Sequence, residues 1–308
     1  SSSTSSSSSS SSPSPTITKW VMFKREDIRK DQLMINIIRL MDDILEREAP
    51  ELHCGRITYN VVPTGAETGY IEFVSNAETL TDIADESSSI LNYLVHCCES
   101  GKNNGIIAEV RQTYQKTMAF WAVASLLLGL GDRHGNNVML KPTGELFHID
   151  FGFILGKDPK PLMPRIRITR DMVEGLGGKV GAKKAHSSAH SSSEHRSLLS
   201  QVEGSDGYKL FIDCTIKTYL CLRKYASLFI QLLSVLPEWD PPIEEKSDIS
   251  RYLINHCETH FLPREPSDEK AAAAMMEFIK NSELRSDNLT IVDLGRKTIR
   301  EWITGKST

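Results

Sequence analysis

Two short polar clusters follow each other closely in the middle of this 308-residue chain. The first reads DRHGNN from Asp132 to Asn137, and the second reads DFG from Asp150. The stretch between them, VMLKPTGELFH, predicts a β-hairpin with its turn at residues 141–145. A hairpin returns the chain to the place where it began, so we expect both clusters at the same end of the fold.

Phosphoryl transfer from a nucleotide needs this set of side chains. An Asn and an Asp supply the hard oxygen ligands that Mg²⁺ prefers, and the metal neutralises charge that develops on the phosphoryl oxygens. An acidic or basic group must also face the attacking hydroxyl. The two clusters together therefore favour a kinase reaction.

The joint pattern is more specific than either cluster alone. A DFG tripeptide occurs by chance in many proteins, but here its Asp follows the Asn of a DRHxxN sequence by thirteen residues. The structural alternative is that Asp132 caps a helix and Arg133 pairs with a surface acid.

The elements that must position these clusters fall into two groups. A small first group is predicted to hold a strand, a long helix and a hairpin whose turn is PTGAET: 20–24, 27–48, 56–62 and 69–74. From Ala77 onward the pattern is mainly helical, interrupted by the two short strands between Val138 and Asp150. The sequence therefore predicts an α+β fold with a small and a large part.

Composition excludes several other classes. A net charge of −4 argues against nucleic-acid binding. Six cysteines without a CxxC pair favour a reducing compartment. The most apolar stretch, Met118 to Gly131, has 14 residues, whereas a membrane-spanning helix needs ~20.

Two biased stretches divide the chain. We expect a disordered Ser-rich tail over 1–19 and a low-complexity insertion over 179–207. The remaining segments are a partial N-lobe with its hinge, a C-lobe segment with the catalytic and activation loops, and the helical remainder of the C-lobe with a C-terminal helix: 20–74, 75–178 and 208–308.

With these residues described, the chain resembles the phosphatidylinositol 3- and 4-kinase family. The order D-R-H-x-x-N is typical of that family, whereas protein kinases have H-R-D. Phe23-Lys24 and the segment 27–33 are similar to its I-F-K-x-G-D-D-L-R-Q-D-x-L motif. GKDPKPL and DMVEGLGG, between residues 156 and 178, look most like class III phosphatidylinositol 3-kinases. The resemblance implies a two-lobed kinase-like domain with a truncated β-rich N-lobe and a mainly helical C-lobe.

The resemblance also implies roles for individual residues. Lys24 would contact the phosphates of ATP, Asp31 and Tyr59 would line the inner pocket, and the backbone at Glu72 and Val74 would bind adenine. At the two ends of the predicted hairpin, Asn137 and Asp150 would bind Mg²⁺ or Mn²⁺. His134 would handle the acceptor proton, with Asp132 orienting the hydroxyl or sharing that role.

The segment after the DFG cluster bears on the substrate. Its positive charges are scattered rather than clustered: Lys157, Lys160, Arg165 and Arg167. Few cations suit a headgroup without extra phosphates. By resemblance, the substrate is unmodified phosphatidylinositol, phosphorylated on its 3-hydroxyl at endosomal or vacuolar membranes during trafficking and autophagy. The resemblance further implies a cytoplasmic location and a regulatory protein-kinase-like subunit.

Departures from the family pattern lead to further expectations. The turn after Lys24 is one residue shorter than the family's, and the strands that cover the ATP phosphates are missing ahead of it. We therefore expect weak or no activity from the chain alone. Alternatives are a kinase-like fragment that binds a regulatory subunit or a membrane, and a 4-kinase.

Two helical patterns stand apart from the catalytic clusters. The last segment, 286–308, carries an apolar stripe with basic residues and Trp302, which suits either packing on the domain or a membrane surface. His256 and His260 lie four residues apart, as in a zinc-binding helix, but the Glu that should follow the first His is absent. We interpret these two histidines as ordinary helix residues.

Overall fold

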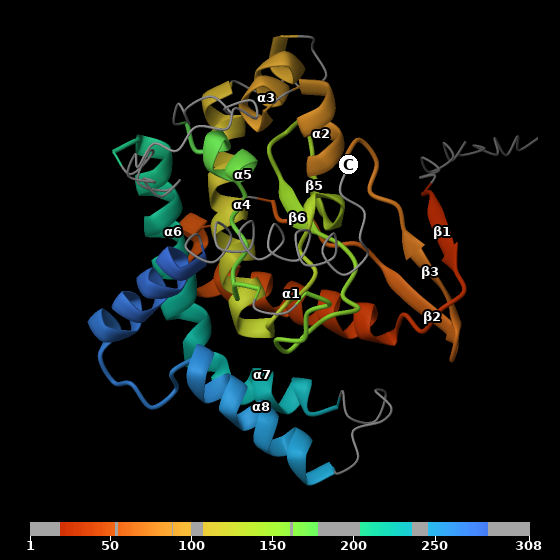
Figure 1. Cartoon of the computed structure of the whole chain (residues 1–308), viewed down its shortest axis with the longest axis vertical. Helices are drawn as coiled ribbons and strands as arrows, with labels where there is room; N and C mark the ends of the chain where they lie inside the picture. Colours follow the sequence, from red (N-terminus) through yellow and green to blue (C-terminus); the bar gives the residue numbers. More distant parts are fainter. Residues whose placement is uncertain are drawn as a thin grey trace, which may run out of the picture.

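The computed structural model describes residues 19–52, 55–87, 89–99, 107–160, 163–177, 204–235 and 246–282. In this part of the chain a three-stranded sheet lies on one flank of a larger, mainly helical body (Figure 1). The predicted α+β class is confirmed. The Ser-rich tail over 1–18, most of the insertion over 179–207 and the C-terminal pattern at 286–308 lie outside the described residues.

The flanking sheet has the strand order β1-β3-β2, and all of its pairs are antiparallel. Its strands are β1 (Val21–Lys24), β2 (Val61–Gly65) and β3 (Thr68–Glu72). In the register between β1 and β3, Lys24 lies opposite Gly69 and Val21 lies opposite Glu72. The strand that carries Lys24 is thereby fixed against the strand that leads into the hinge.

The predicted hairpin is present, but its turn was placed wrongly. Pro63 and Gly65 belong to strand β2, and the chain reverses at residues 66–67. Residues 56–60, the first part of the predicted strand over 56–62, form no strand. A proline is tolerated in β2 because β2 is an edge strand, and the register shift between Pro63 and Gly65 absorbs the irregularity.

Helix α1 (Arg29–Glu48) packs under this sheet, on the side of the larger body. Its apolar residues recur at helical spacing and are buried: Met34, Ile35, Ile37, Ile38, Met41, Ile44 and Leu45. The Asp27 carboxylate accepts a hydrogen bond from the Arg29 N–H at 3.1 Å, which satisfies one of the donors at the helix start. Asp31 lies in the first turn and is buried.

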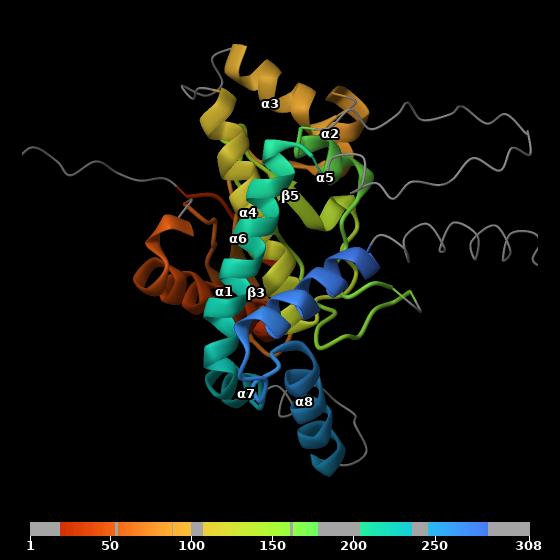
Figure 2. The same ribbon diagram turned by 90° about the vertical axis from the view of Figure 1, so that its left-hand side faces the viewer.

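Helix α4 (Ile107–Leu128) runs through the centre of the larger body and packs along α6 (Asp206–Leu222) (Figure 2). The apolar stretch from Met118 is buried on every side, as expected for a central helix. Helices α2 (Leu80–Ser87) and α3 (Ile90–Glu99) lie at one end of this body.

The other end of the larger body holds α7 (Ala226–Leu233) and α8 (Lys246–His260). The remaining helical pieces are α5 (Arg170–Gly175), a further helix over 268–282, and three short 3₁₀ turns: η1 (Pro50–Leu52), η2 (Gly135–Asn137) and η4 (Arg223–Tyr225). None of the helices in the described ranges combines the length and the apolar character needed to cross a bilayer.

A second small sheet lies inside the larger body. Strands β5 (Val138–Leu140) and β6 (Leu146–His148) form the hairpin predicted from the sequence, and β4 (Glu78–Thr79) pairs with the outer edge of β5. Strand β6 packs against α4. The hairpin is thus held rigidly between the central helix and the segment that leaves the hinge.

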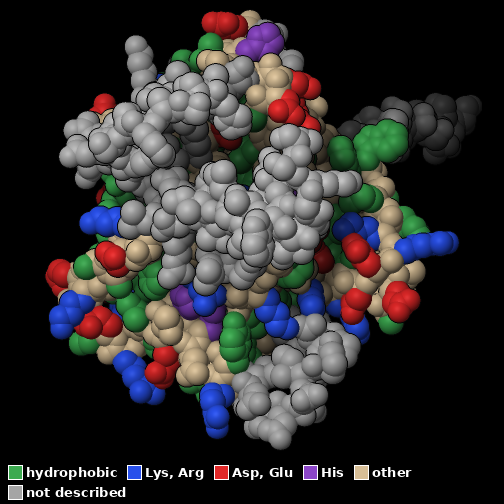
Figure 3. Space-filling model, in the orientation of Figure 1, with side chains coloured by type: hydrophobic (Ala, Val, Ile, Leu, Met, Phe, Trp, Pro, Cys, Tyr) green, Lys and Arg blue, Asp and Glu red, His purple; other side chains and the backbone are tan. Residues whose placement is uncertain are grey.

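Exposed apolar side chains gather on the flanking sheet (Figure 3). Phe23 and Tyr70 lie opposite each other in the register, their rings 5.3 Å apart, and Val62 lies beside Tyr70. All three remain exposed. This face of the sheet therefore lies outside the core that α1 and the larger body share.

Candidate active site

The two polar clusters meet at one end of the β5–β6 hairpin, as predicted. The N–H of Ile149 donates to the carbonyl oxygen of Asn137 at 3.1 Å, which extends the strand pairing to the last residue of one cluster. Asp150 follows directly. The hairpin therefore places Asn137 and Asp150 side by side although thirteen residues separate them in the sequence.

Arg133 is buried and ties the two clusters together. Its Nε donates to the carbonyl oxygen of Gly131 at 2.7 Å, and its Nη1 donates to that of Ile149 at 2.7 Å. Its Nη2 donates to the carbonyl oxygen of Asp150. These bonds hold the loop at Asp132 against the segment of Asp150, so Arg133 has a structural function.

Asp132 and His134 lie next to each other, partly exposed. The distance from His134 Nε2 to Asp132 Oδ2 is 3.7 Å, and their side chains are 40% and 25% exposed. The N–H of Asp132 donates to Asp158 Oδ2 at 2.8 Å, and the Asn137 Nδ2 donates to the Asp132 carbonyl oxygen at 3.0 Å. The Asn137 amide is therefore oriented by its nitrogen, and its oxygen is left for another ligand.

Both aspartates of the paired clusters have backbone conformations that are rare for residues other than glycine. The φ angle is +54° at Asp132 and +60° at Asp150. Such angles carry local strain, which persists where the surroundings fix the backbone. Here the Arg133 guanidinium supplies much of that restraint through its bond to the Asp150 carbonyl oxygen.

An aromatic stack holds the DFG segment from behind. Phe151 is fully buried and stacks on Trp121 of α4 at 6.5 Å between centroids, and Trp121 stacks on His148 at 4.6 Å. Burial lowers the pKa of His148 well below its ordinary value, so this imidazole is neutral within the stack. On the other side, the N–H of Phe151 donates to Asp31 Oδ1 at 3.0 Å.

A cavity of about 230 Å³ lies between the flanking sheet and the hairpin. Among its lining residues are all five predicted nucleotide-binding residues and both predicted metal ligands: Lys24, Asp31, Tyr59, Glu72, Val74, Asn137 and Asp150. Asp132 and His134 are not among the residues that line it. They are joined to it through the hydrogen bond between Asn137 and the Asp132 carbonyl.

The sequence interpretation missed the remaining residues of the cavity wall, most of which are apolar: Met22, Ile71, Phe73, Thr79, Met139, Phe147 and Ile149. Alternation along the strands could have identified some of them, because Met22 and Lys24 share one face of β1. Met139 and Phe147 are a cross-strand pair in the hairpin. The wall is thus suited to a flat apolar group above a charged floor.

Charges interact across this cavity. Burial alone would lower the pKa of the Lys24 ammonium, but its hydrogen bond to Glu26 (2.6 Å) and the nearby charges of Glu26, Asp150 and Asp31 raise it above its ordinary value. Burial raises the pKa of the Asp31 carboxyl and that of the Tyr59 hydroxyl. Lys24 is therefore charged, and the two carboxylates that it meets in the cavity are those of Asp31 and Asp150.

The donor set fits a hard divalent cation. The Asp150 carboxylate and the Asn137 amide oxygen are the ligand types of Mg²⁺, which usually takes one or two carboxylates together with substrate phosphates. No cluster of three or more His, Cys, Asp or Glu side chains suited to a metal occurs among the described residues. A metal here would thus complete its coordination with nucleotide oxygens and water.

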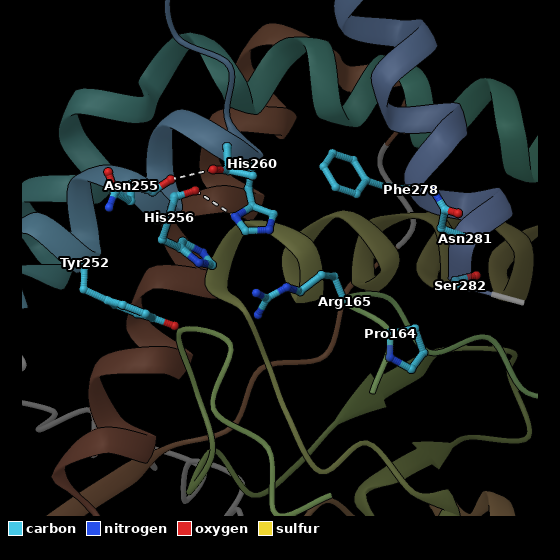
Figure 4. Close-up of a pocket in the computed structure, with 10 residues that line it drawn as sticks. Pro164, Arg165, Tyr252, Asn255, His256, His260, Phe278, Asn281 and Ser282 are labelled. Carbon is cyan, nitrogen blue, oxygen red and sulfur yellow. Dashed lines mark hydrogen bonds between the residues drawn. The ribbon is translucent and has the colours of Figure 1, made fainter. Parts of the chain in front are cut away.

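The four predicted substrate-loop cations do not gather in one place. Arg167 is partly buried, and its charge interacts with Asp158 and Asp132. It therefore lies near the loop over residues 129–137, which we call the catalytic loop. The backbone N–H of Lys160 donates to Asp158 Oδ1 at 2.8 Å. Arg165 lines a different cavity, against α8 and the helix over 268–282 (Figure 4).

A small sheet beside a helical body, with a lysine, a buried carboxylate and a hairpin-borne Asn/Asp pair around the cavity between them, defines a fold of the kinase type. The family model for phosphatidylinositol 3- and 4-kinases matches residues 17–103 and 90–237. The chain belongs to the phosphatidylinositol 3- and 4-kinase family.

Individual relatives agree with this assignment. The nodule isoform of phosphatidylinositol 3-kinase from Glycine max is 42% identical over 161 residues, which cover 51% of this chain and 19% of the relative. Phosphatidylinositol 3-kinase pik3 from Schizosaccharomyces pombe is 32% identical over 80% of this chain and 28% of its own length. Phosphatidylinositol 3-kinase VPS34 from Saccharomyces cerevisiae is 38% identical over 51% of this chain and 18% of its own length. The aligned part of this chain thus spans less than a third of these relatives.

Proposed function

We propose that this chain is the catalytic part of a lipid kinase that transfers the γ-phosphoryl group of ATP to the 3-hydroxyl of phosphatidylinositol. The observation that carries this proposal is the convergence of Lys24, Asn137 and Asp150 on one cavity. The names of the relatives, which are phosphatidylinositol 3-kinases, support the lipid substrate and the hydroxyl position.

Nucleotide binding would use both the walls and the rim of this cavity. The adenine ring would lie against the apolar side chains of Met22, Ile71 and Met139, with hydrogen bonds to the backbone between Glu72 and Val74. Lys24 would pair with the phosphates, because its ammonium is charged and lies near Asp150. Asp150 and the oxygen of Asn137 would hold Mg²⁺ or Mn²⁺, which neutralises charge on the phosphoryl oxygens when bound.

The acceptor hydroxyl would be handled by Asp132 and His134. Proton transfer needs a side chain that can accept a proton and that the hydroxyl can reach, and an accessible imidazole can do so. His134 is 40% exposed, and the Asp132 carboxylate lies 3.7 Å away. That spacing allows the carboxylate either to orient the hydroxyl or to stabilise the protonated imidazole.

The setting of the reaction is also part of this proposal. Lys157, Lys160 and Arg167 give the loop a modest positive charge that suits a headgroup without further phosphates. The similarity to VPS34 supports work at endosomal or vacuolar membranes, in trafficking and autophagy, together with a regulatory protein-kinase-like subunit. The enzyme would associate with these membranes peripherally, from the cytoplasm.

The test is transfer of labelled phosphate from ATP to phosphatidylinositol vesicles, with Mg²⁺ present and the labelled inositol position identified. Asp150→Asn keeps the shape of the side chain and removes its charge, so we expect kcat to fall about 1000-fold, as when a key electrostatic group of an active site is lost. Glu145→Gln, at the opposite end of the same hairpin, is the matched control and should retain activity.

Each result separates the candidates. Label on the 3-hydroxyl that depends on Asp150 supports the proposal, and label on the 4-hydroxyl replaces it with a 4-kinase. A folded chain that transfers no phosphate, but binds a regulatory subunit or membrane, would indicate a kinase-like binding module instead.

A further inference from the structure

A second and larger cavity lies on the opposite side of the catalytic loop. Its volume is about 510 Å³, within the range typical of small-molecule sites. Three segments that are far apart in the sequence form it: residues 164–165, helix α8 and the helix over 268–282. Figure 4 shows Arg165 extending from its loop towards the two imidazoles of α8, with Phe278 and Asn281 on the other side.

The charge of this cavity has one sign. Its lining holds the Arg165 guanidinium and the imidazoles of His256 and His260, and no carboxylate is among the described residues that line it. Within the described part of the chain, Arg165 makes one hydrogen bond there, a long one of 3.4 Å from Nη1 to the carbonyl oxygen of Gly156. An arginine guanidinium that makes only a long hydrogen bond is suited to an anion, which it can bind through two parallel hydrogen bonds.

The two histidines are anchored in a way that leaves one nitrogen of each towards the cavity. His256 Nε2 bonds to the carbonyl oxygen of Leu127 at 2.9 Å, and His260 Nδ1 bonds to that of His256 at 2.7 Å. A carbonyl oxygen only accepts, so these two nitrogens carry the protons. Among the described residues, His256 Nδ1 and His260 Nε2 have no hydrogen-bond partner.

Burial and neighbouring charge keep both imidazoles neutral in the absence of an anion. The pKa of His256 is lowered to about 4, first by burial and then by His260 and Arg165, and the pKa of His260 is lowered for similar reasons. A bound anion would oppose this effect, because it favours the protonated ring. The cavity therefore offers one fixed cation and two imidazole nitrogens that become donors when an anion draws a proton onto each ring.

The rest of the lining is rich in groups that suit hydroxyls. Asn255, Thr259, Asn281 and Ser282 line the cavity together with Tyr252. The hydroxyls of Thr259 and Ser282 and the Asn281 Nδ2 donate within their own helices, so the side-chain oxygens of Thr259, Asn281 and Ser282 are available as acceptors. A bare phosphate ion would fill only a small part of the volume. A phosphate that carries a polyhydroxyl group matches both the charge and the size.

We propose that this cavity binds a phosphate ester of a polyhydroxyl compound, of the inositol phosphate class, with the Arg165 guanidinium as its anchor and the imidazoles of His256 and His260 as further contacts. The ligand can be a free sugar phosphate or the headgroup of a lipid. This inference goes beyond the proposed kinase reaction and does not depend on it.

A ligand in this cavity would restrain the backbone of the catalytic loop. His256 bonds to the last turn of α4, and its Cε1 lies 2.7 Å from where a side chain at Gly129 would begin. The Tyr252 hydroxyl donates to the carbonyl oxygen of Leu155, on the segment after the DFG cluster. An anion that holds Arg165 to α8 thus braces the backbone that carries both polar clusters.

The test is isothermal titration calorimetry of the whole chain with two separate probes. Inositol 1-phosphate tests the free compound, and phosphatidylcholine vesicles that contain phosphatidylinositol test the lipid headgroup. Arg165→Gln should weaken binding about tenfold or more, and His260→Gln about threefold, because a hydrogen bond to a charged group is worth more than a neutral one. Arg264→Gln is the matched control, since Arg264 is exposed and pairs with Glu258 outside the cavity.

The comparison of variants gives each result a meaning. Binding of either probe that both cavity variants weaken supports the proposal, and the probe that binds identifies the source of the ligand. Thermal melting of each variant checks that it is folded, and Asn281→Ala replaces His260→Gln if the latter fails to fold. The proposal is overturned if neither probe binds, if Arg165→Gln alone weakens binding, or if Arg264→Gln weakens it equally. Each of these outcomes leaves phosphate transfer by the other cavity unaffected.

Discussion

The two cavities on either side of the catalytic loop have opposite electrostatic character. The front cavity, between the flanking sheet and the hairpin, is lined by three carboxylates, from Asp31, Glu72 and Asp150, with Lys24 as its cation. The rear cavity, beside α8, is lined by Arg165 and two histidines. The difference fits the two proposals, in which the front cavity binds a metal with its nucleotide and the rear cavity binds an anion alone.

Two backbone segments, 129–131 and 153–156, are paired with each other next to the polar clusters, and we call this pair of segments the partition. The N–H of Gly131 donates to the carbonyl oxygen of Phe153 at 2.9 Å, and the N–H of Gly156 donates to that of Gly129 at 2.7 Å. A side chain at Gly131 would collide with the carbonyl of Lys157. The chain after each polar cluster is thus paired so closely that only glycine fits, and the two sites share this partition.

The largest expected effect comes from removing the aromatic support of the partition. Phe151→Ala should lower the free energy of unfolding by about 3–5 kcal/mol, because the ring is fully buried and leaves a cavity beside Trp121. Chemical denaturation measures the change. Phe153→Ala, two residues on and exposed, should cost less than about 0.5 kcal/mol. Equal losses would mean that the stack does not support the front cavity.

The pH dependence of the free energy of unfolding tests whether His256 is buried as a neutral imidazole in the rear cavity. The pKa of His256 is about 4 in the folded state and near 6.5 when unfolded, so the unfolded chain binds the proton first as pH falls. Stability from this group is fully present above pH ~6.5 and is lost between pH ~6.5 and ~4, by about 3 kcal/mol. His256→Gln should make unfolding free energy less dependent on pH in that window, whereas His96→Gln, on exposed α3 surface, should not. An unchanged pH profile for His256→Gln would contradict the burial of a neutral imidazole.

Lys24 should affect the front cavity alone. Lys24→Met should lower kcat/KM for ATP about 100-fold, because it removes the cation that interacts with Asp150 and that we propose to pair with the phosphates. Lys217→Met, on exposed α6 surface, is the control. Binding of inositol 1-phosphate should be the same in both variants. A parallel loss of that binding in Lys24→Met would show that the two cavities are not separate sites.

The smallest effect is expected at Asp31. Burial raises the pKa of this carboxyl, so its ionised form at neutral pH costs stability, which is regained as pH falls and the group takes up a proton. Asp31→Asn removes that cost and keeps an acceptor for the Phe151 N–H, so unfolding free energy at pH 7 should rise by about 1 kcal/mol. Kinase activity should nevertheless fall. A variant less stable than the wild type would mean that the charge stabilises the front cavity.

Local patterns in the sequence were sufficient to predict how the front cavity is built. The hairpin pattern between Asn137 and Asp150 brought both clusters together, and the resemblance supplied Lys24, Asp31 and Tyr59, which line the same cavity. The hairpin turn at 63–68 was misplaced because Pro63 and Gly65 are usual turn residues, while an edge strand with a register shift also accepts them.

The rear cavity could not have been predicted in this way. Arg165 lies in a segment without periodicity, and its neighbours in the cavity are about ninety residues further along the chain on α8 and about 115 residues further on the next helix. The spacing of His256 and His260 was noticed, but their partners, the backbone at Leu127 and the Arg165 fork, depend on how α8 packs on α4. Only tertiary structure brings these groups together.

The positive φ angles at Asp132 and Asp150 affect how mutagenesis of this family should be interpreted. Alanine at either position would remove the carboxylate. It would also destabilise the fold, because its methyl group disfavours the left-handed backbone conformation. An alanine scan would therefore mix chemistry with misfolding and overstate the catalytic share of both residues. Asparagine, which tolerates this conformation, removes the charge without that cost, and the difference between the glycine and alanine variants at the same position gives the backbone's share.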